Sequence, residues 1–146
     1  MRDDDHAAVA VLLGRPPQGR FEVVVRDEQG EPLVIRNEPL LDDGTPMPTR
    51  YWLVGEAESR AVSHLEAAGG VRRAARDVDP YELIDAHHRY WEEREAAIPT
   101  GWPGARPNGG VGGTRQGVKC LHCHYAWYLA GGDDPVGRWV AKELQP

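Results

Sequence analysis

Short apolar runs separated by turn-forming residues dominate the first third of the chain. Residues 21–26 (FEVVVR) and 32–36 (PLVIR) are rich in β-branched side chains and flank the turn-forming sequence DEQG at 27–30. A third apolar run, RYWLV at 50–54, follows a loop at 37–49 that contains three prolines. The pattern predicts a hairpin of two strands and a third strand in the same sheet.

Helix-forming segments occupy most of the remaining chain. Asp–Pro pairs at 79–80 and 134–135 supply an N-cap and a first-turn proline, and glycine pairs at 69–70 and 131–132 supply helix ends. A glycine-rich stretch at 100–117 is predicted to be a loop. The predicted helices cover residues 56–68, 79–97, 118–130 and a terminal segment that begins at 134.

These elements predict an α+β fold, in which a small antiparallel sheet of about three strands is covered by about four helices. Residues 14–146 are expected to form a single domain, because a chain of 146 residues supports one core. Residues 1–13 are acidic and then apolar, and we expect them to be loosely held. In the helix predicted at 79–97, Ile84, His88 and Trp91 share one stripe, and its glutamates are expected to be solvated.

Charge and composition exclude several classes of function. The net charge of −6 argues against a protein that binds the phosphate backbone of nucleic acids. No apolar stretch approaches the roughly 20 residues of a membrane-spanning helix, and no basic segment marks an export signal. The two cysteines cannot form a disulfide framework. We therefore expect a cytoplasmic protein that binds neither nucleic acid nor a membrane.

The glycine-rich loop leads into the predicted helix at 118–130 and is a candidate anion site. Backbone N–H groups and the positive end of a helix favour an anion at such a position. The spacing departs from that of the nucleotide P-loop, because Val118 precedes the lysine and no Ser or Thr follows it. The candidate contacts to a small anionic ligand are Gly112, Gly113, Gly117 and Lys119.

The sequence CLHCH at 120–124 is a candidate metal site. On a helix, Cys120, Cys123 and His124 share one face, and two thiolates with an imidazole suit zinc. The fourth ligand would come from a histidine of an earlier helix: His88, His87 or His64. The same letters match the attachment signature of c-type haem, but haem is not expected because no export signal is visible. The alternative to a metal site is simple packing of these side chains.

A third interpretation makes Cys120 a nucleophile. A helix N-terminus and the neighbouring Lys119 would both favour the thiolate, and His87, His88 or His122 would act as the base. This arrangement is typical of a Cys/His hydrolase or transferase. A fourth interpretation is an interaction module that uses exposed aromatic residues to bind a protein partner or a second copy of the chain.

Several separate motifs occur in the order found in the bacterial "domain of unknown function 501" family, and the chain resembles that family over about residues 14–140. The motifs are GRPP (14–17), PLLDDGTPMPTRYWL (39–53), VSHLEAAG (62–69), AHHRY (86–90) and GVKCLH (117–122). The resemblance implies a small cytoplasmic protein of GC-rich bacteria without an established activity. It places function at Lys119, Cys120, His122 and His87.

The resemblance also bears on the metal hypothesis. Members of that family commonly carry a C-x-C after the first strand and a T-C-P after the YWL strand, which with K-C-L-H would form a zinc-like set. Here RDEQG (26–30) and VGE (54–56) occupy those positions, so that only Cys120 and His122 match. The resemblance therefore implies either a lost site or a site that uses Cys123 and His124 instead.

The favoured hypothesis is a non-enzymatic binding or regulatory domain that holds a small anion or a divalent metal ion. Its site would lie where the glycine-rich loop meets the helix of Cys120, Cys123 and His124. The Cys120-dependent enzyme and the interaction module remain as alternatives.

Overall fold

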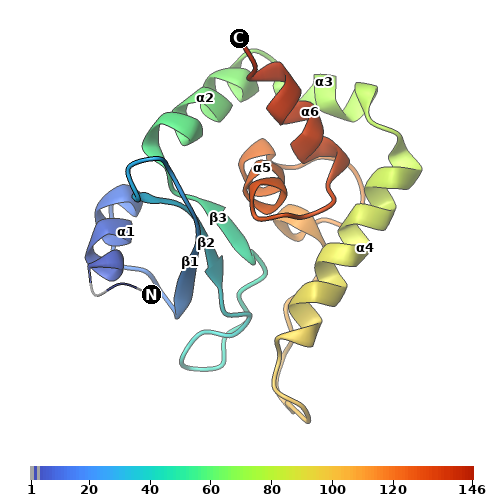
Figure 1. Cartoon of the computed structure of the whole chain (residues 1–146). Coiled ribbons are helices and arrows are strands. Elements are labelled where there is room, and N and C mark those ends of the chain that lie inside the picture. Colours follow the sequence, from blue (N-terminus) through green and yellow to red (C-terminus); the bar gives the residue numbers. More distant parts are fainter. Residues whose placement is uncertain (1, 3) are drawn as a thin grey trace.

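The computed structural model describes residue 2 and residues 4–146, and this part of the chain contains six helices and a three-stranded sheet (Figure 1). Met1 and Asp3, in the segment expected to be loosely held, lie outside the described residues. In chain order the elements are α1 (Asp5–Leu13), β1 (Phe21–Arg26), β2 (Pro32–Asn37), β3 (Tyr51–Leu53), α2 (Glu56–Ala67), α3 (Gly70–Asp77), α4 (Pro80–Ala96), the short 3₁₀ helix η1 (Val111–Gly113), α5 (Leu121–Leu129) and α6 (Pro135–Glu143). The predicted α+β class is confirmed.

The sheet has the order β1-β2-β3 with both pairs antiparallel, as the hairpin pattern predicts. Its turn is closed by Asp27, whose Oδ1 accepts hydrogen bonds from the backbone N–H groups of Gln29 and Glu31, both at 2.9 Å. Val34 and Ile35 are consecutive in β2 and both fully buried, so they point to opposite faces. Both faces of the sheet are therefore covered.

Different helices cover the two faces of the sheet (Figure 1). Ile35 packs with Val9 of α1 and with Phe21 and Val54. On the opposite face, Val34 packs against Tyr90 of α4 and against Ala126 and Trp127 of α5. The buried members of this cluster are Val34, Tyr51, Ala86, Tyr90, Val111, Ala126 and Trp127. Helix α5 thus lies between the sheet and the outer helices.

The N-terminal segment, which the sequence predicts to be loosely held, contains a helix that packs on the sheet. Residues 5–13 form α1, whose Val9 is fully buried against the sheet. The carboxylate of Asp5 is also buried and receives a hydrogen bond of 2.6 Å from the guanidinium of Arg26 on β1. The partners that hold this helix lie on strands distant in sequence, so local propensity alone did not indicate it. Among the described residues, no helix is both long enough and apolar enough to cross a bilayer.

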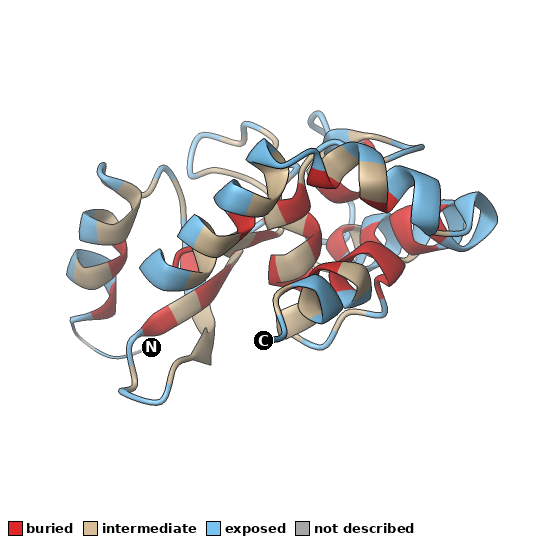
Figure 2. Cartoon of the chain, turned by 90° about the horizontal axis from the view of Figure 1, so that it is seen from above, coloured by how far each residue is buried: buried red, intermediate tan, exposed pale blue. Residues whose placement is uncertain are grey.

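The outer helices pack against α5 through a second apolar cluster. Its members come from all the helices after the sheet: Val62, Ala74, Leu83, Leu121, Val136 and Val140. Seen from above, the buried positions of these helices face the interior and the exposed positions face outward (Figure 2). The first residue of α5, Leu121, is fully buried here, and this contact fixes the position of the helix N-terminus.

The described residues form six helices, which roughly agrees with the predicted count of about four, α1 and α3 being additional. Two predicted features need correction. Helix α5 begins at Leu121 and not at Val118, since Gly117 has a positive φ of 69° and Cys120 is extended. The stripe of Ile84 and Trp91 is the exposed side of α4, with 42% and 36% of these side chains accessible.

Candidate functional site

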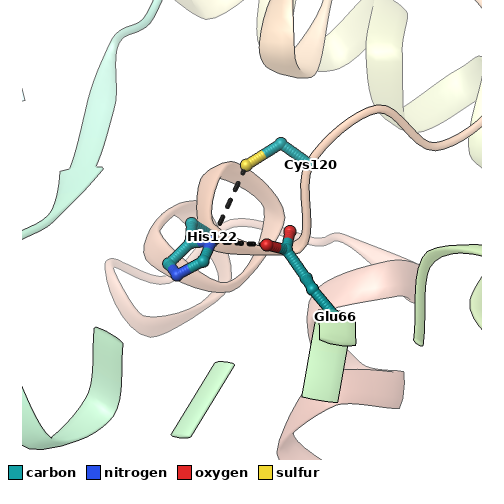
Figure 3. A group of neighbouring side chains, drawn as sticks. All are labelled: Glu66, Cys120 and His122. Carbon is teal, nitrogen blue, oxygen red and sulfur yellow. Dashed lines mark hydrogen bonds and ion pairs between the residues drawn. The ribbon is translucent and has the colours of Figure 1, made fainter. Parts of the chain in front are cut away.

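Three side chains from two separate helical segments meet at the N-terminus of α5. They are Glu66 from α2, Cys120 from the residue before α5, and His122 from its first turn (Figure 3). One carboxylate oxygen, the thiol sulfur and one ring nitrogen all lie within 4.8 Å of one another, and each residue is partly buried. Within the described part of the chain, this is the one group of His, Cys, Asp or Glu side chains with metal-ligand spacing. We call it the thiol cluster.

Glu66 is held in the thiol cluster because it caps α5. Its Oε2 accepts a hydrogen bond of 2.9 Å from the backbone N–H of Leu121, a group that has no partner within its own helix. A carboxylate is also favoured there by the positive end of the helix dipole. The other carboxylate oxygen, Oε1, lies 3.2 Å from Nδ1 of His122. One side chain thus fixes the position of α2 relative to the cluster and supplies a ligand atom.

The orientation of the His122 ring is set by α2. Its Nε2 donates to the backbone carbonyl of Ser59 at 3.0 Å and lies 3.1 Å from the hydroxyl of Ser63. Nδ1 therefore faces Glu66 and the sulfur of Cys120, which is 3.9 Å away. This is how proteins commonly hold a metal-ligating histidine, with the second ring nitrogen donating to a carbonyl.

The electrostatics of the thiol cluster favour a thiolate and an imidazolium when no metal is bound. Interaction with the Cys123 side chain, followed by that with His122, lowers the pKa of Cys120 well below its ordinary value, although burial opposes the shift. Interaction with Cys120 is the largest of the effects that raise the pKa of His122 to about 9, and the Ser59 carbonyl and Glu66 add to it. The thiolate and the imidazolium therefore form an ion pair, and the Glu66 carboxylate lies beside the same imidazolium.

Cys123 lies beside Cys120 but outside the group of three ligand atoms. It packs against the cluster formed by the sheet and α5, and it is only partly exposed. The interaction with Cys120 and burial both raise the pKa of the Cys123 thiol. The two cysteines therefore differ in character, Cys120 being the more acidic and Cys123 the thiol that faces the core.

His124 does not join the cysteines. Its side chain is fully buried on the other side of α5, where Nδ1 donates to Oδ2 of Asp134 at 2.6 Å. The ring also packs edge-on against His87, with centroids 5.6 Å apart. The prediction that Cys120, Cys123 and His124 share one helix face is therefore wrong. Cys120 precedes the helix, and the side chain near its sulfur is that of His122.

His87 fastens the glycine-rich loop to α4. Its Nδ1 accepts from the backbone N–H of Val111 at 3.0 Å, and its Nε2 donates to the carbonyl of Gly117 at 2.8 Å. A Cβ at Gly110 would lie only 2.6 Å from that Nδ1, which explains the glycine there. Both ring nitrogens are thus occupied by the loop, and His87 is not part of the thiol cluster.

The residues proposed for an anion contact have other roles in this arrangement. Gly112, Gly113 and Gly117 have φ values of 68°, 81° and 69°, which shape the loop. Lys119 is exposed and precedes α5 by two residues. The N–H of Leu121, at the helix N-terminus, is bonded to Glu66. A carboxylate of the protein therefore occupies the place expected for an anion.

The His87 contact predicts a pH dependence of stability. Burial lowers the pKa of His87 from its ordinary 6.5, so that as the pH falls below 6.5 the unfolded chain takes up a proton that the folded protein does not. His87 should therefore reduce stability on acidification, by up to about 1.4 kcal/mol per pH unit. Chemical denaturation at several pH values between 7 and 5 measures the free energy of unfolding and so checks this slope. In His87→Gln the free energy of unfolding should decline less steeply as the pH falls. In the control variant His88→Gln it should decline as it does in the unchanged protein. Equal slopes in all three proteins would contradict the prediction.

His88 lies on the exposed side of α4 and is not a ligand of the thiol cluster. Its Nε2 is 2.7 Å from Glu92, and its ring stacks on Trp91 with centroids 5.7 Å apart. A hollow of about 370 Å³ lies between this side of α4 and the glycine-rich loop. The residues of the thiol cluster do not line it.

Sequence reasoning missed Glu66 and the two serines that surround His122. A signal was present, because Ser59, Ser63 and Glu66 are spaced at i, i+4 and i+7 and form a polar stripe on α2. In the structure this stripe contacts the first turn of α5, and the sequence alone does not indicate that contact. Sequence reasoning did single out Cys120 and His122, and the structure brings these two together.

A family model described as "Protein of unknown function (DUF501)" matches residues 23–142. The match confirms the resemblance drawn from the sequence motifs, and it spans the thiol cluster, from α2 to the first turn of α5. No curated protein and no solved structure gives a significant match to the chain.

Proposed function

Because the chain belongs to the family described as "Protein of unknown function (DUF501)", a description that names no activity, we propose a function from the geometry of the thiol cluster. The protein binds one divalent transition-metal ion, with zinc as the first candidate, through Glu66, Cys120 and His122. In this role it is a binding or regulatory domain.

The observation that carries the proposal is the prearranged orientation of the three ligand atoms. The Ser59 carbonyl orients the His122 ring, and the Leu121 N–H orients the Glu66 carboxylate. Cys120 lies 3.9 Å from the same ring nitrogen that Glu66 approaches. A metal ion between these atoms would replace the proton on Nδ1, and the groups that hold the ligands would stay in place.

The donor set favours zinc over the hard cations. Calcium and magnesium prefer oxygen ligands, whereas a thiolate, an imidazole and a carboxylate together suit zinc and similar transition metals. Three protein ligands leave the fourth tetrahedral position to water or a small molecule. This geometry supports a metal ion over the anion that the glycine-rich loop suggested, because a carboxylate already occupies the helix N-terminus.

A Cys120-dependent hydrolase or transferase is the second candidate function. The contact of 3.9 Å between Cys120 and His122 favours it, because a thiolate beside an imidazolium is the resting form of many cysteine nucleophiles. The two candidates differ in what zinc does. A bound ion should protect Cys120 from alkylation under the first proposal, and zinc should leave alkylation unchanged if Cys120 serves only as a nucleophile.

The proposal is tested by zinc competition against a chromophoric chelator, with reduced protein purified without a metal-affinity column. We expect about one ion per chain, and Glu66→Gln should weaken binding about tenfold or more because the neutral amide is a poorer ligand. His88→Gln is the matched control, since His88 lies outside the cluster, and it should bind as the unchanged protein does. Binding well below one ion per chain, or equal affinity in the Glu66 variant, would overturn the proposal.

A further inference from the structure

The two cysteines form a C-x-x-C unit whose members differ in environment. Cys120 is the N-cap residue of α5, with an extended backbone (φ −148°, ψ 122°), and Cys123 is the third residue of that helix. The two residues are three apart, so they lie within one helical turn, and both are partly exposed to solvent. Cys120 adjoins His122 and the exposed Lys119, whereas Cys123 packs against the core cluster of the sheet and α5. Cys123 is thus the thiol that packs against the core, and Cys120 lies at the end of the helix.

We propose that Cys120 and Cys123 act as a thiol–disulfide exchange pair, which donates two electrons to small external disulfides and so reduces them. Cys120 is the attacking cysteine and Cys123 the resolving cysteine. This activity goes beyond metal binding and does not depend on it, although both use the same sulfur. A Cys120–Cys123 disulfide and a metal ion at the thiol cluster would therefore exclude each other.

The exchange takes place in two displacements. The Cys120 sulfur, as a thiolate, attacks one sulfur of an external disulfide R–S–S–R; a bond forms between Cys120 and that sulfur, and the other R–S⁻ leaves with the electron pair of the broken bond. Cys123 then attacks the sulfur of Cys120, the protein disulfide forms, and the second R–S⁻ leaves. The protein dithiol loses two electrons and two protons, and the external disulfide leaves as two molecules of R–SH.

The environment of each sulfur supports this order of attack. An attacking thiol must be accessible and lie near a group that can accept its proton or stabilise its thiolate. Cys120 is partly exposed, and its sulfur lies 3.9 Å from Nδ1 of His122, the ring nitrogen that also contacts Glu66. A resolving thiol need only reach the first sulfur, and Cys123 follows Cys120 at i+3 in the first turn of the same helix, a spacing at which side chains are neighbours. The Leu121 side chain between them is fully buried and anchors the turn that holds both cysteines.

The test uses the reduced protein, kept metal-free with a chelator, and oxidised glutathione as the probe. After acid quenching and alkylation, mass spectrometry should find the unchanged protein with an internal disulfide and no bound glutathione. Cys123→Ser should instead accumulate one glutathione on Cys120, because the resolving thiol is absent. Cys120→Ser should form its adduct roughly tenfold more slowly or worse, since Cys123 is packed against the core.

Two results would overturn this inference: glutathione accumulating on the unchanged protein without an internal disulfide, or equal rates in the two serine variants. Peptide mapping of the unchanged protein decides the first point even where a variant fails to fold. Repeating the reaction with zinc in place of the chelator separates the two proposals. Slower oxidation with zinc supports both, and oxidation at the same rate supports the exchange pair while contradicting the metal site.

Discussion

Replacing Asp134 with alanine should lower the free energy of unfolding by about 3–5 kcal/mol, which is a large part of the total stability of a domain of this size. Asp134 and His124 are both fully buried, and their hydrogen bond of 2.6 Å joins the loop before α6 to the middle of α5. Without the carboxylate, the imidazole stays in the core without its partner. The loss should be measured by chemical denaturation of metal-free protein.

Asp134 also caps α6, and this second role accounts for part of the loss. Its Oδ1 accepts from the backbone N–H groups of Val136 and Gly137, at 2.9 Å and 3.3 Å. An N-cap of this kind contributes about 1 kcal/mol, so most of the expected effect comes from the pairing with His124. Asp134→Asn keeps an oxygen for the cap but removes the charge beside His124, and it should lose an intermediate amount.

Asp79 offers a matched control for the capping role. It also precedes a proline, and its side chain accepts from the backbone N–H of Tyr81 at 2.9 Å, but it is exposed and has no buried partner. Asp79→Ala should therefore cost only about 1 kcal/mol. Equal losses in the Asp79 and Asp134 variants would show that the buried pair with His124 contributes nothing beyond the cap.

Replacing Cys120 with serine should weaken zinc binding by about 100-fold or more, the largest effect expected on function. Even groups that only orient a ligand typically contribute 10–100-fold in metal affinity, and Cys120 would supply the thiolate itself. A serine hydroxyl at that position stays protonated and is a poor ligand for zinc. The affinity should be measured by the same chelator competition in the presence of reductant.

Cys123→Ser is the matched control, because it makes the same substitution in the same turn of α5. Cys123 is outside the group of three ligand atoms, so its variant should lose less than about tenfold in affinity. Weak binding in both variants would mean that the two sulfurs bind the ion together. Unchanged binding in the Cys120 variant would remove Cys120 from the site.

The strands and the capped helices followed from local signals. The hairpin, the Asp79–Pro80 start of α4 and the Asp134–Pro135 start of α6 all lie where turn and capping residues predict them. These features depend on neighbours within a few residues, and a single sequence contains that information. Helix α1 did not follow, because the burial of Val9 and Asp5 depends on β1 and β2.

The candidate site could be predicted only in part for a related reason. The sequence singled out Cys120 and His122, but it placed Cys120 inside a helix and grouped it with His124. The true helix start depends on Glu66, which caps Leu121 from 55 residues earlier in the chain. The partner of His124 is likewise a capping residue of another helix, Asp134. Helical spacing indicates which side chains share a face, but it does not indicate what lies opposite that face.

The proposed site requires the sulfur of Cys120 and the Nδ1 of His122 to bind one metal ion together with Glu66. Cobalt(II) is a suitable probe, because its absorption spectrum reports both the coordination number and a thiolate ligand. We expect one equivalent to give the visible bands of a four-coordinate ion and a thiolate-to-cobalt charge-transfer band, which Cys120→Ser abolishes and Cys123→Ser keeps. A spectrum that stays that of aqueous cobalt after one equivalent would contradict the metal site.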